Sequence, residues 1–269
     1  MDQGVAIKKQ SQIKEIFKRF KKNRMAVFGL VVIILLILCA LFPSAIAPYG
    51  YDDNFGRDIL SRVIYGCRVS LLIGLISVSI SCVLGVMLGC IAGYYGNKVD
   101  NLVMRFIDIM LAIPQMLLAM SIVAALGIGT EHLILAIAIG SVPGYARIVR
   151  GSILSVKGQE FIEAARSIGA SDFRIITRHI VPNCLAPIIV QATMSIASAI
   201  LSTASMSFIG LGIEPPTPEW GSMLSAGRAY LRDHWFVVTF PGIAIMLTVF
   251  AFNLFGDGLR DALDPKLKQ

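Results

Sequence analysis

The chain has 269 residues, of which 56% are hydrophobic and 15% are charged, and its formal net charge is +7. Soluble domains carry about 25% charged residues, so this composition indicates a protein of the lipid bilayer. It excludes a soluble enzyme with a single membrane anchor, because no polar segment between the apolar stretches is long enough to fold as a separate domain. Any catalytic chemistry is therefore expected on a partner.

The first apolar stretch, residues 25–47, follows a basic leader at residues 1–24. It is too long for the hydrophobic part of a signal peptide and reaches Pro43 and Pro48 without a small-residue cleavage site, so we predict a retained helix. Further stretches approach the roughly 20 residues that cross about 30 Å of hydrocarbon. We predict an all-α membrane protein with six transmembrane helices, the other five at residues 69–95, 108–127, 133–149, 185–208 and 236–255.

Two segments outside the spans have more than one interpretation. Residues 48–67 are expected to form an external segment with an interfacial helix that continues to residue 71. This helix either positions the second span or contacts substrate. Residues 210–225 contain three prolines that prevent a continuous helix, and they form either an external gate, a loop facing a receptor, or a simple connector.

Proline and glycine also mark the interior of the spans. Pro114 and Pro143 are expected to kink their helices. Gly85, Gly89 and Gly93 follow one another at intervals of four residues, so they lie on one face of a helix and allow a neighbouring helix to approach closely.

The Lys and Arg residues are unevenly distributed between the two sides of the predicted membrane. With a cytoplasmic N-terminus, 19 of the 24 lie inside, and the other five are Arg57, Arg62, Arg68, Arg228 and Arg232. The positive-inside rule therefore places both termini, including the tail at residues 258–269, in the cytoplasm. This distribution accounts for the net charge, so no nucleic acid is expected as a partner.

The sequence offers no catalytic or metal-binding constellation. No Cys-x-x-Cys pair occurs, the three histidines fall on two predicted membrane faces, and the phosphate-binding pattern Gly-x-x-x-x-Gly-Lys-Ser/Thr is absent. We expect no catalytic residue, no metal site and no cofactor in this chain.

The predicted cytoplasmic loop at residues 155–183 is far longer than a connection between two helices requires. Phe161, Ala164 or Ala165, and Ile168 recur at helical spacing, which predicts a short amphipathic helix.

The residues that follow predict where this helix ends and the next begins. Glu163 and Arg166 are spaced as an ion pair. Gly169 suits the left-handed turn that ends the first helix, and Ser171 suits the N-cap of a second helix running to Pro182.

This helix pair has two interpretations on periodicity alone. It either inserts into a groove of a partner protein, with its alanines at the contact face, or lies along the lipid headgroups through Arg174 and Arg178.

The run Glu163-Ala164-Ala165, followed by Gly169 and by the segment from His179 to Asn183, resembles the EAA signature of membrane subunits of ABC importers. The resemblance implies the type I ABC importer permease fold, with an ABC transmembrane type-1 domain at residues 68–257. It also implies that Glu163, Ala164, Ala165 and Gly169 belong to the coupling segment that docks on the ATP-hydrolysing subunit, and it favours the docking interpretation.

Other motifs resemble the dipeptide, oligopeptide and nickel permeases within that group. One departure is the short segment at residues 48–54, where relatives carry a longer external stretch. The matching motifs begin at Phe55-Gly56-Arg57-Asp58, Gly93-Tyr94-Tyr95-Gly96, Arg105 with Asp108, Ser207-Phe208-Ile209-Gly210, Pro215-Pro216-Thr217-Pro218-Glu219-Trp220-Gly221 and Gly256-Asp257-Gly258.

The resemblance implies a non-catalytic subunit of an ATP-driven importer in a bacterial inner or plasma membrane, with dipeptides or oligopeptides as substrate. The implied partners are a second permease subunit, two ATP-binding subunits that hold ATP and magnesium, and an external substrate-binding protein. Import of nickel or a metal chelate is an alternative within the family. An ion-coupled secondary transporter is the alternative of another class, although no inverted repeat and no acidic group at the middle of a span favours it.

Three amide side chains within spans, Gln115, Gln191 and Asn253, are candidates to line the translocation path. Polar groups in hydrocarbon normally face a cavity or another helix. Hydrogen bonding between helices explains them equally well.

Overall fold

The computed structural model describes residues 12–50, 58–214 and 216–263, with side chains from residue 15 onward. Every regular element over these ranges is helical, which confirms the predicted all-α fold. The elements are α1 (Gln12–Lys22), α2 (Arg24–Leu41), α3 (Pro43–Ile46), α4 (Ile59–Tyr95), α5 (Asn97–Ala112), α6 (Gln115–Leu126), α7 (Thr130–Val156), α8 (Glu160–Ser167), α9 (Asp172–Ile175), a π-helical turn (Ile176–Ile180), α10 (Val181–Asn183), α11 (Leu185–Phe208), α12 (Trp220–Gly227), a 3-10 turn (Arg228–Tyr230) and α13 (Phe236–Leu263).

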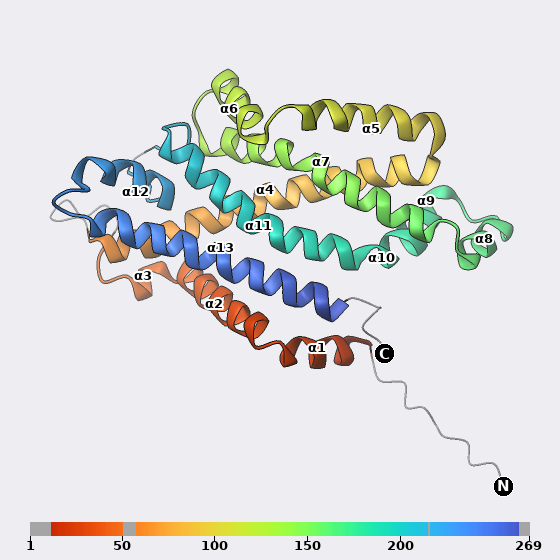
Figure 1. Ribbon diagram of the computed structural model, residues 1–269, viewed down its shortest axis with the longest axis horizontal. Coiled ribbons are helices and arrows are strands. Elements are labelled where there is room, and N and C mark those ends of the chain that lie inside the picture. The colour runs from red at the N-terminus through yellow and green to blue at the C-terminus, as the bar shows by residue number, and fades with distance from the viewer. Residues whose placement is uncertain (1–11, 51–57, 215, 264–269) are drawn as a thin grey trace, which may run out of the picture.

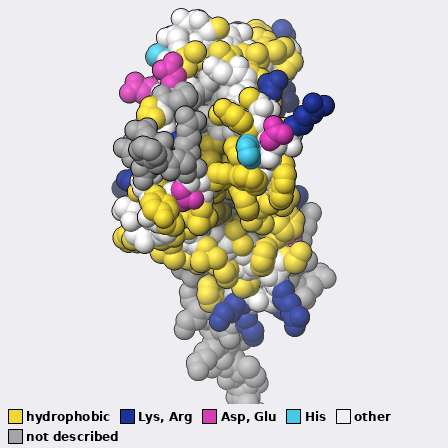
Figure 2. Space-filling model, turned by 90° about the vertical axis from the view of Figure 1, so that its left-hand side faces the viewer, with side chains coloured by type: hydrophobic (Ala, Val, Ile, Leu, Met, Phe, Trp, Pro, Cys, Tyr) yellow, Lys and Arg dark blue, Asp and Glu magenta, His cyan; other side chains and the backbone are white. Residues whose placement is uncertain are grey.

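The long helices α2, α4, α7, α11 and α13 run along the long axis of the molecule (Figure 1). Within the described ranges these five are long and apolar enough to cross a membrane, and the pair α5–α6 makes a sixth span if it is counted as one broken crossing. At one end of the bundle lie α3 and α12, and at the other lie α8 and α9. Figure 2 shows hydrophobic side chains over much of the α3 and α12 end, with small groups of charged side chains among them.

The third span differs from the continuous helix predicted at residues 108–127. Helix α5 ends at Ala112, and α6 leaves at an angle of 87°. Proline disfavours the helical conformation in the residue before it. Ile113 accordingly has extended backbone angles, and so does Pro114 in its ψ angle. The predicted kink at Pro114 is therefore a complete break.

Helix α4 is longer than the second predicted span. Its 37 residues extend over about 55 Å at 1.5 Å per residue. Asp58 caps its N-terminus by accepting hydrogen bonds from the backbone amides of Leu60 and Ser61. The expected interfacial helix is thus the first part of α4 rather than a separate element, and residues 51–57 of the external segment lie outside the described residues.

Two other predicted spans, the first and the fourth, have different bounds in the structure. The first predicted span ends at Leu41 and is followed by the short helix α3. The fourth span is longer than predicted, because α7 continues through Pro143 from Thr130 to Val156 without a break. A long helix tolerates an internal proline when its other turns are held by packing, and α7 is the most deeply buried of the spanning helices.

Helices α4 and α7 pack along the glycine stripe predicted from the sequence. A Cβ atom added at Gly89 would lie 2.7 Å from the Ala146 carbonyl oxygen and 2.7 Å from the Val149 Cβ, and one at Gly93 would lie 2.9 Å from the Ile153 Cβ. Only glycine permits backbones to approach so closely. The prediction of close packing at these glycines is confirmed.

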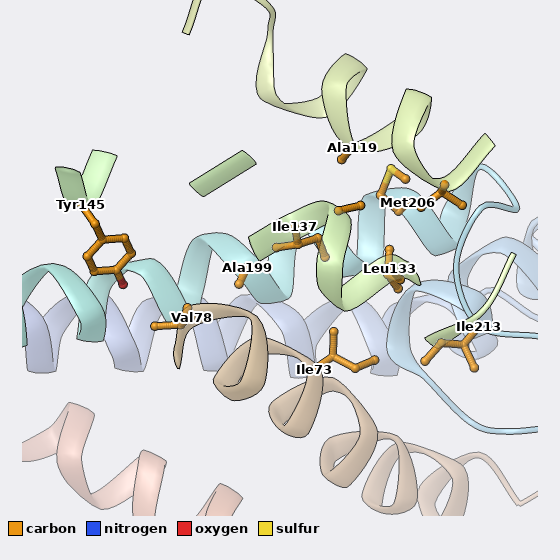
Figure 3. Close-up of a cluster of buried hydrophobic side chains, with 11 residues drawn as sticks. Ile73, Val78, Ala119, Leu133, Ile137, Tyr145, Ala199, Met206 and Ile213 are labelled. Atoms are coloured by element: carbon orange, nitrogen blue, oxygen red, sulfur yellow. The ribbon is translucent and has the colours of Figure 1, made fainter. Parts of the chain in front are cut away.

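A buried apolar cluster joins α4, α6, α7 and α11 (Figure 3). Ile73 of α4, Leu133 and Ile137 of α7, and Met206 of α11 are almost completely buried in it. Ala119 and Val123 bring α6 into the same cluster. The second half of the broken span is therefore held by the α4–α7 pair.

We predict that Gly89→Ala destabilises the protein, whereas Gly144→Ala does not. The added methyl at Gly89 has no room, and overpacking of this kind costs about 1–3 kcal/mol. Gly144 is an exposed helical position with nothing within 4 Å of an added Cβ. The apparent melting temperature in detergent should fall for Gly89→Ala only. Equal melting temperatures for the two variants would contradict the close packing of α4 and α7.

Candidate functional site

The segment from α8 to α9, residues 160–175, lies beyond the ends of α11 and α13 at one tip of the molecule (Figure 1). We call it the α8–α9 unit. It packs on the ends of α4 and α7 through an apolar cluster that contains Ile162, Ala165, Ile175, Val149 and Ile153. The unit is therefore seated on the two most closely packed helices of the bundle.

Gly169 ends α8 as predicted. Its φ angle is +76°, in the left-handed region that favours glycine. The Gly169 amide donates to the Arg166 carbonyl oxygen at 2.9 Å, and the Ala170 amide donates to the Ala165 carbonyl oxygen at 3.1 Å. These two hydrogen bonds form a Schellman motif. Ser171 then caps α9 by accepting from the Arg174 amide, which confirms the predicted N-cap.

The second helix of the pair is less regular than predicted. Helix α9 continues into a π-helical turn over residues 176–180 and then into α10, which contains Pro182. Proline has no amide hydrogen to donate to the carbonyl four residues earlier. The wider turn lets the Val181 amide donate to the Ile176 carbonyl instead, so one helix running to Pro182 is replaced by three short pieces.

The inward face of α8 is formed by Ile162 and Ala165, which are buried in the chain. Glu163 and Ala164 face outward and are exposed. Of the predicted stripe, Ala165 is buried within the chain, whereas Phe161, Ala164 and Ile168 are exposed. Ala165 is only 5% exposed, so it can act on a partner only by seating the helix.

Four apolar residues of the unit are exposed. Ile168 is 84% exposed and Phe173 is 78% exposed, and Phe161 and Ala164 are also exposed. We call these four residues the apolar tip.

Tyr94, at the end of α4, contacts both helices of the unit. Its hydroxyl donates to Asp172 Oδ1 at 2.6 Å, and the Arg166 guanidinium lies 5.5 Å from its ring centroid. The interaction with Tyr94 raises the pKa of Arg166, so the guanidinium stays charged. Arg166 therefore uses Tyr94 as its close partner rather than forming the predicted ion pair with Glu163. Sequence reasoning missed Tyr94, although the Gly93-Tyr94-Tyr95-Gly96 motif contained it.

Two ion pairs fasten α5 to α7. Arg150 binds Asp100 with two hydrogen bonds, Nε to Oδ1 at 2.5 Å and Nη2 to Oδ2 at 2.6 Å. Arg147 Nη2 lies 2.5 Å from Asp108 Oδ1. Bidentate pairs of this kind fix orientation as well as distance. Helix α5, the first half of the broken span, is therefore held against α7.

A cavity of about 160 Å³ lies between α6, α7 and α11, and Gln115 is on its wall. The Gln115 side-chain amide donates to Ser141 Oγ at 3.1 Å, and the side chain packs against Gly140. The wall also contains Ser202 and Ser205 of α11. The full lining is Gln115, Met116, Ala119, Ile137, Leu201, Ser202, Ser205 and Met206.

The other two predicted path residues are not on this wall. Gln191 donates to Ser195 Oγ at 3.2 Å within α11, and Asn253 is half-buried on α13. The structure thus does not bring the three amides together in this cavity. Their role in transport stays a prediction.

The proline-rich segment at the opposite end is anchored in the bundle. Glu219 caps α12 by accepting from the amides of Gly221 and Ser222, each at 2.8 Å. Trp220 is buried against Gly66 and donates from Nε1 to the Val63 carbonyl oxygen at 3.0 Å. A loose connector is therefore not an adequate description of this segment.

Residues 85–269 match the family of binding-protein-dependent transport system inner membrane components, and residues 11–61 match the N-terminal TM domain of oligopeptide transport permease C. The chain belongs to this permease family. The prediction of an ABC importer permease is confirmed, and so are its transport function and its location in the inner membrane. The alternative of an ion-coupled secondary transporter is set aside by the same match.

The permease is similar over nearly its whole length to curated transport proteins. It is 46% identical to the di/tripeptide transport system permease protein DppC of Pseudomonas aeruginosa (strain UCBPP-PA14), over 96% of this chain and 93% of that protein. It is 47% identical to the dipeptide transport system permease protein DppC of Alkalihalophilus pseudofirmus, over 99% and 93%. It is 48% identical to the glutathione transport system permease protein GsiD of Escherichia coli O157:H7, over 94% and 90%.

Solved structures support the fold. A chain of the MetNI methionine ABC transporter in an inward-facing conformation has a TM-score of 0.62 at 20% identity, covering 76% of the permease and 97% of that chain. An amino acid ABC transporter has a TM-score of 0.57 at 16% identity, covering 76% and 97%. At these identities the likeness shows the fold alone, and it confirms the predicted ABC permease architecture.

We predict that Gly169→Val loosens the end of α8, whereas Gly158→Val does not. A side chain in the left-handed region costs about 1–2 kcal/mol. Both glycines have open space around an added Cβ, but only Gly169 has a positive φ. Hydrogen exchange in the peptide around residues 166–173 should accelerate about tenfold for Gly169→Val, the factor that 1.4 kcal/mol represents. Unchanged exchange in that variant would show that the turn does not stabilise the unit.

Proposed function

We propose that this permease forms half of the translocation path of an ATP-driven importer of short peptides. A second permease subunit forms the other half, two ATP-binding subunits hold ATP and magnesium, and an external binding protein delivers substrate. This chain holds no cofactor of its own in the proposal. The single observation that carries it is the α8–α9 unit, a seated helix pair with an outward apolar tip at one end of a permease fold.

The position of the unit favours docking on the ATPase over lying on the headgroups. The unit extends past the ends of α11 and α13 along the axis of the bundle (Figure 1). A bilayer around the apolar middle of the bundle leaves this tip in water. Exposed apolar side chains in water are typical of a protein interface. Phe161, Ala164, Ile168 and Phe173, with Glu163 beside them, are the proposed contact surface, and Gly169 sets its shape.

The same assignment orients the protein. If the α8–α9 unit meets a cytoplasmic ATPase, then α1 and the C-terminal end of α13, which lie toward the same half of the molecule, are cytoplasmic as well. This orientation agrees with the uneven distribution of Lys and Arg. The α3 and α12 end then faces the binding protein.

Short peptides are the proposed substrate because the relatives named for a substrate are di/tripeptide, dipeptide and glutathione permeases. Glutathione is itself a tripeptide. The proposal places substrate passage beside the cavity at Gln115, whose amide can donate to and accept from a peptide group.

The substrate class is tested on the binding protein that copurifies with this permease. Dipeptides and tripeptides should raise its melting temperature by ligand linkage, whereas Ni²⁺ alone should not. Stabilisation by Ni²⁺ or a nickel chelate, with no response to peptides, would replace the peptide proposal by the metal alternative.

The docking surface is tested by Glu163→Lys combined with Ala164→Asp. Both residues are exposed, so the permease should insert and keep its melting temperature. An unpaired charge buried in a partner groove is strongly unfavourable, so copurification with the ATPase should be lost. Asp261→Lys, an exposed charge reversal on α13, is the control and should copurify normally. If the double variant binds its ATPase as well as the wild type does, the proposed docking surface is wrong.

The path is tested by Gln115→Leu. Assembly and basal ATP hydrolysis should be preserved, and peptide uptake should fall about tenfold, as expected for the loss of a hydrogen bond worth about 1–1.5 kcal/mol. Ser141→Ala removes the hydrogen-bond partner of Gln115 without changing the cavity wall, and it should transport normally. Equal peptide uptake by the two variants would contradict the proposal that Gln115 lines the translocation path.

A further inference from the structure

The described contacts between the α8–α9 unit and the spanning helices are of two kinds. The first is the apolar cluster of Ile162, Ala165 and Ile175 with α4 and α7. Such a cluster holds the unit in place but is non-directional. The second is the set of polar contacts around Tyr94, which has direction and connects charged groups.

Tyr94 meets the two helices of the unit with different parts of one side chain. Its hydroxyl donates to Asp172 in the first turn of α9, and its ring face meets Arg166 in the last turn of α8. Asp172 and Arg166 carry opposite charges and lie on either side of the Gly169 turn. A single side chain from α4, itself 3% exposed, therefore fixes the orientation of α8 relative to α9.

The backbone of Tyr94 is fixed as well. Lys157, directly after α7, donates from Nζ to the Tyr94 carbonyl oxygen and lies 5.8 Å from the ring centroid. The neighbouring Gly93 packs directly on Ile153 of α7. A force that displaces Tyr94 should therefore displace the ends of both α4 and α7.

From these ends the contacts continue toward the cavity. Helices α4 and α7 are in close contact along their glycine stripe. The Arg150–Asp100 and Arg147–Asp108 pairs then connect α7 to α5, the first half of the broken span. The second half begins at Gln115 on the cavity wall.

We propose that Tyr94 is the positioning residue that makes α4 and α7 follow the α8–α9 unit when the ATPase moves it. The proposal rests on the proposed docking function of that unit. Tyr94 itself contacts neither the ATPase nor the substrate. Its effect is on the orientation in which α8 and α9 are held against the spanning helices.

The test uses the complete transporter with its binding protein, reconstituted in lipid nanodiscs. Tyr94→Phe keeps the aromatic ring and loses the hydroxyl, which interacts with both Asp172 and Arg166, and Asp172→Ala removes only the acceptor of that hydroxyl. Both variants should copurify with the ATPase and keep basal ATP hydrolysis. Hydrolysis stimulated by the substrate-loaded binding protein should fall roughly tenfold in each, since a hydrogen bond to a charged group is lost.

Two comparisons separate positioning from mere packing. The double variant Tyr94→Phe with Asp172→Ala should be no worse than Tyr94→Phe alone, because Tyr94→Phe has already removed the hydrogen bond to Asp172. Tyr95→Phe changes the adjacent tyrosine, which is 49% exposed. In this control variant the loaded binding protein should stimulate ATP hydrolysis as it does in the wild type.

Normal stimulation of Tyr94→Phe would overturn the proposal, as would additive losses in the double variant. Loss of copurification in Tyr94→Phe would also overturn it, because the hydroxyl would then be needed for assembly itself. Failure of the docking proposal gives a different result, which is normal copurification of the Glu163→Lys, Ala164→Asp variant.

Discussion

The backbones of α4 and α7 approach each other along Gly85, Gly89 and Gly93, and this approach positions the elements that carry function. In a bilayer the lipid tails are as apolar as the helix surfaces, so helices associate through close van der Waals packing rather than through the hydrophobic effect. Three small residues at intervals of four provide that packing over about two turns. Helix α4 also contacts α2, α5, α11 and α13, so the pair is the centre of the fold.

The functional elements attach to this pair at different levels. At one end, the α8–α9 unit is seated by its apolar cluster and oriented by Tyr94. Further along, two ion pairs hold α5. Beyond the break at Pro114, α6 packs into the cluster of Figure 3 and borders the cavity. If the α8–α9 unit docks on an ATPase as proposed, these connections join the docking end to the cavity.

Sequence reasoning predicted features that depend on local chemistry. The turn at Gly169, the cap at Ser171 and the glycine stripe follow from the preferences of single residues, and all three are present. Features that depend on packing were missed. Periodicity alone did not distinguish the Ile162 face of α8 from the Ile168 face, because both are apolar and the choice depends on which residue meets α4 and α7. The break at Pro114 shows the same limit, since the sequence predicted a kink there and the structure has a complete break, whereas α7 continues through Pro143.

The central claim is that the α8–α9 unit and the α4–α7 pair behave as one body. Spin labels at Arg174 and Met87, two exposed positions on α9 and α4 outside the proposed contact surface, report their separation directly in a variant whose native cysteines are replaced. The account predicts one narrow distance distribution that is the same in the nucleotide-free transporter and in the transporter arrested with ATP. A distribution that shifts or broadens on ATP binding would contradict it, because the unit would then move relative to α4.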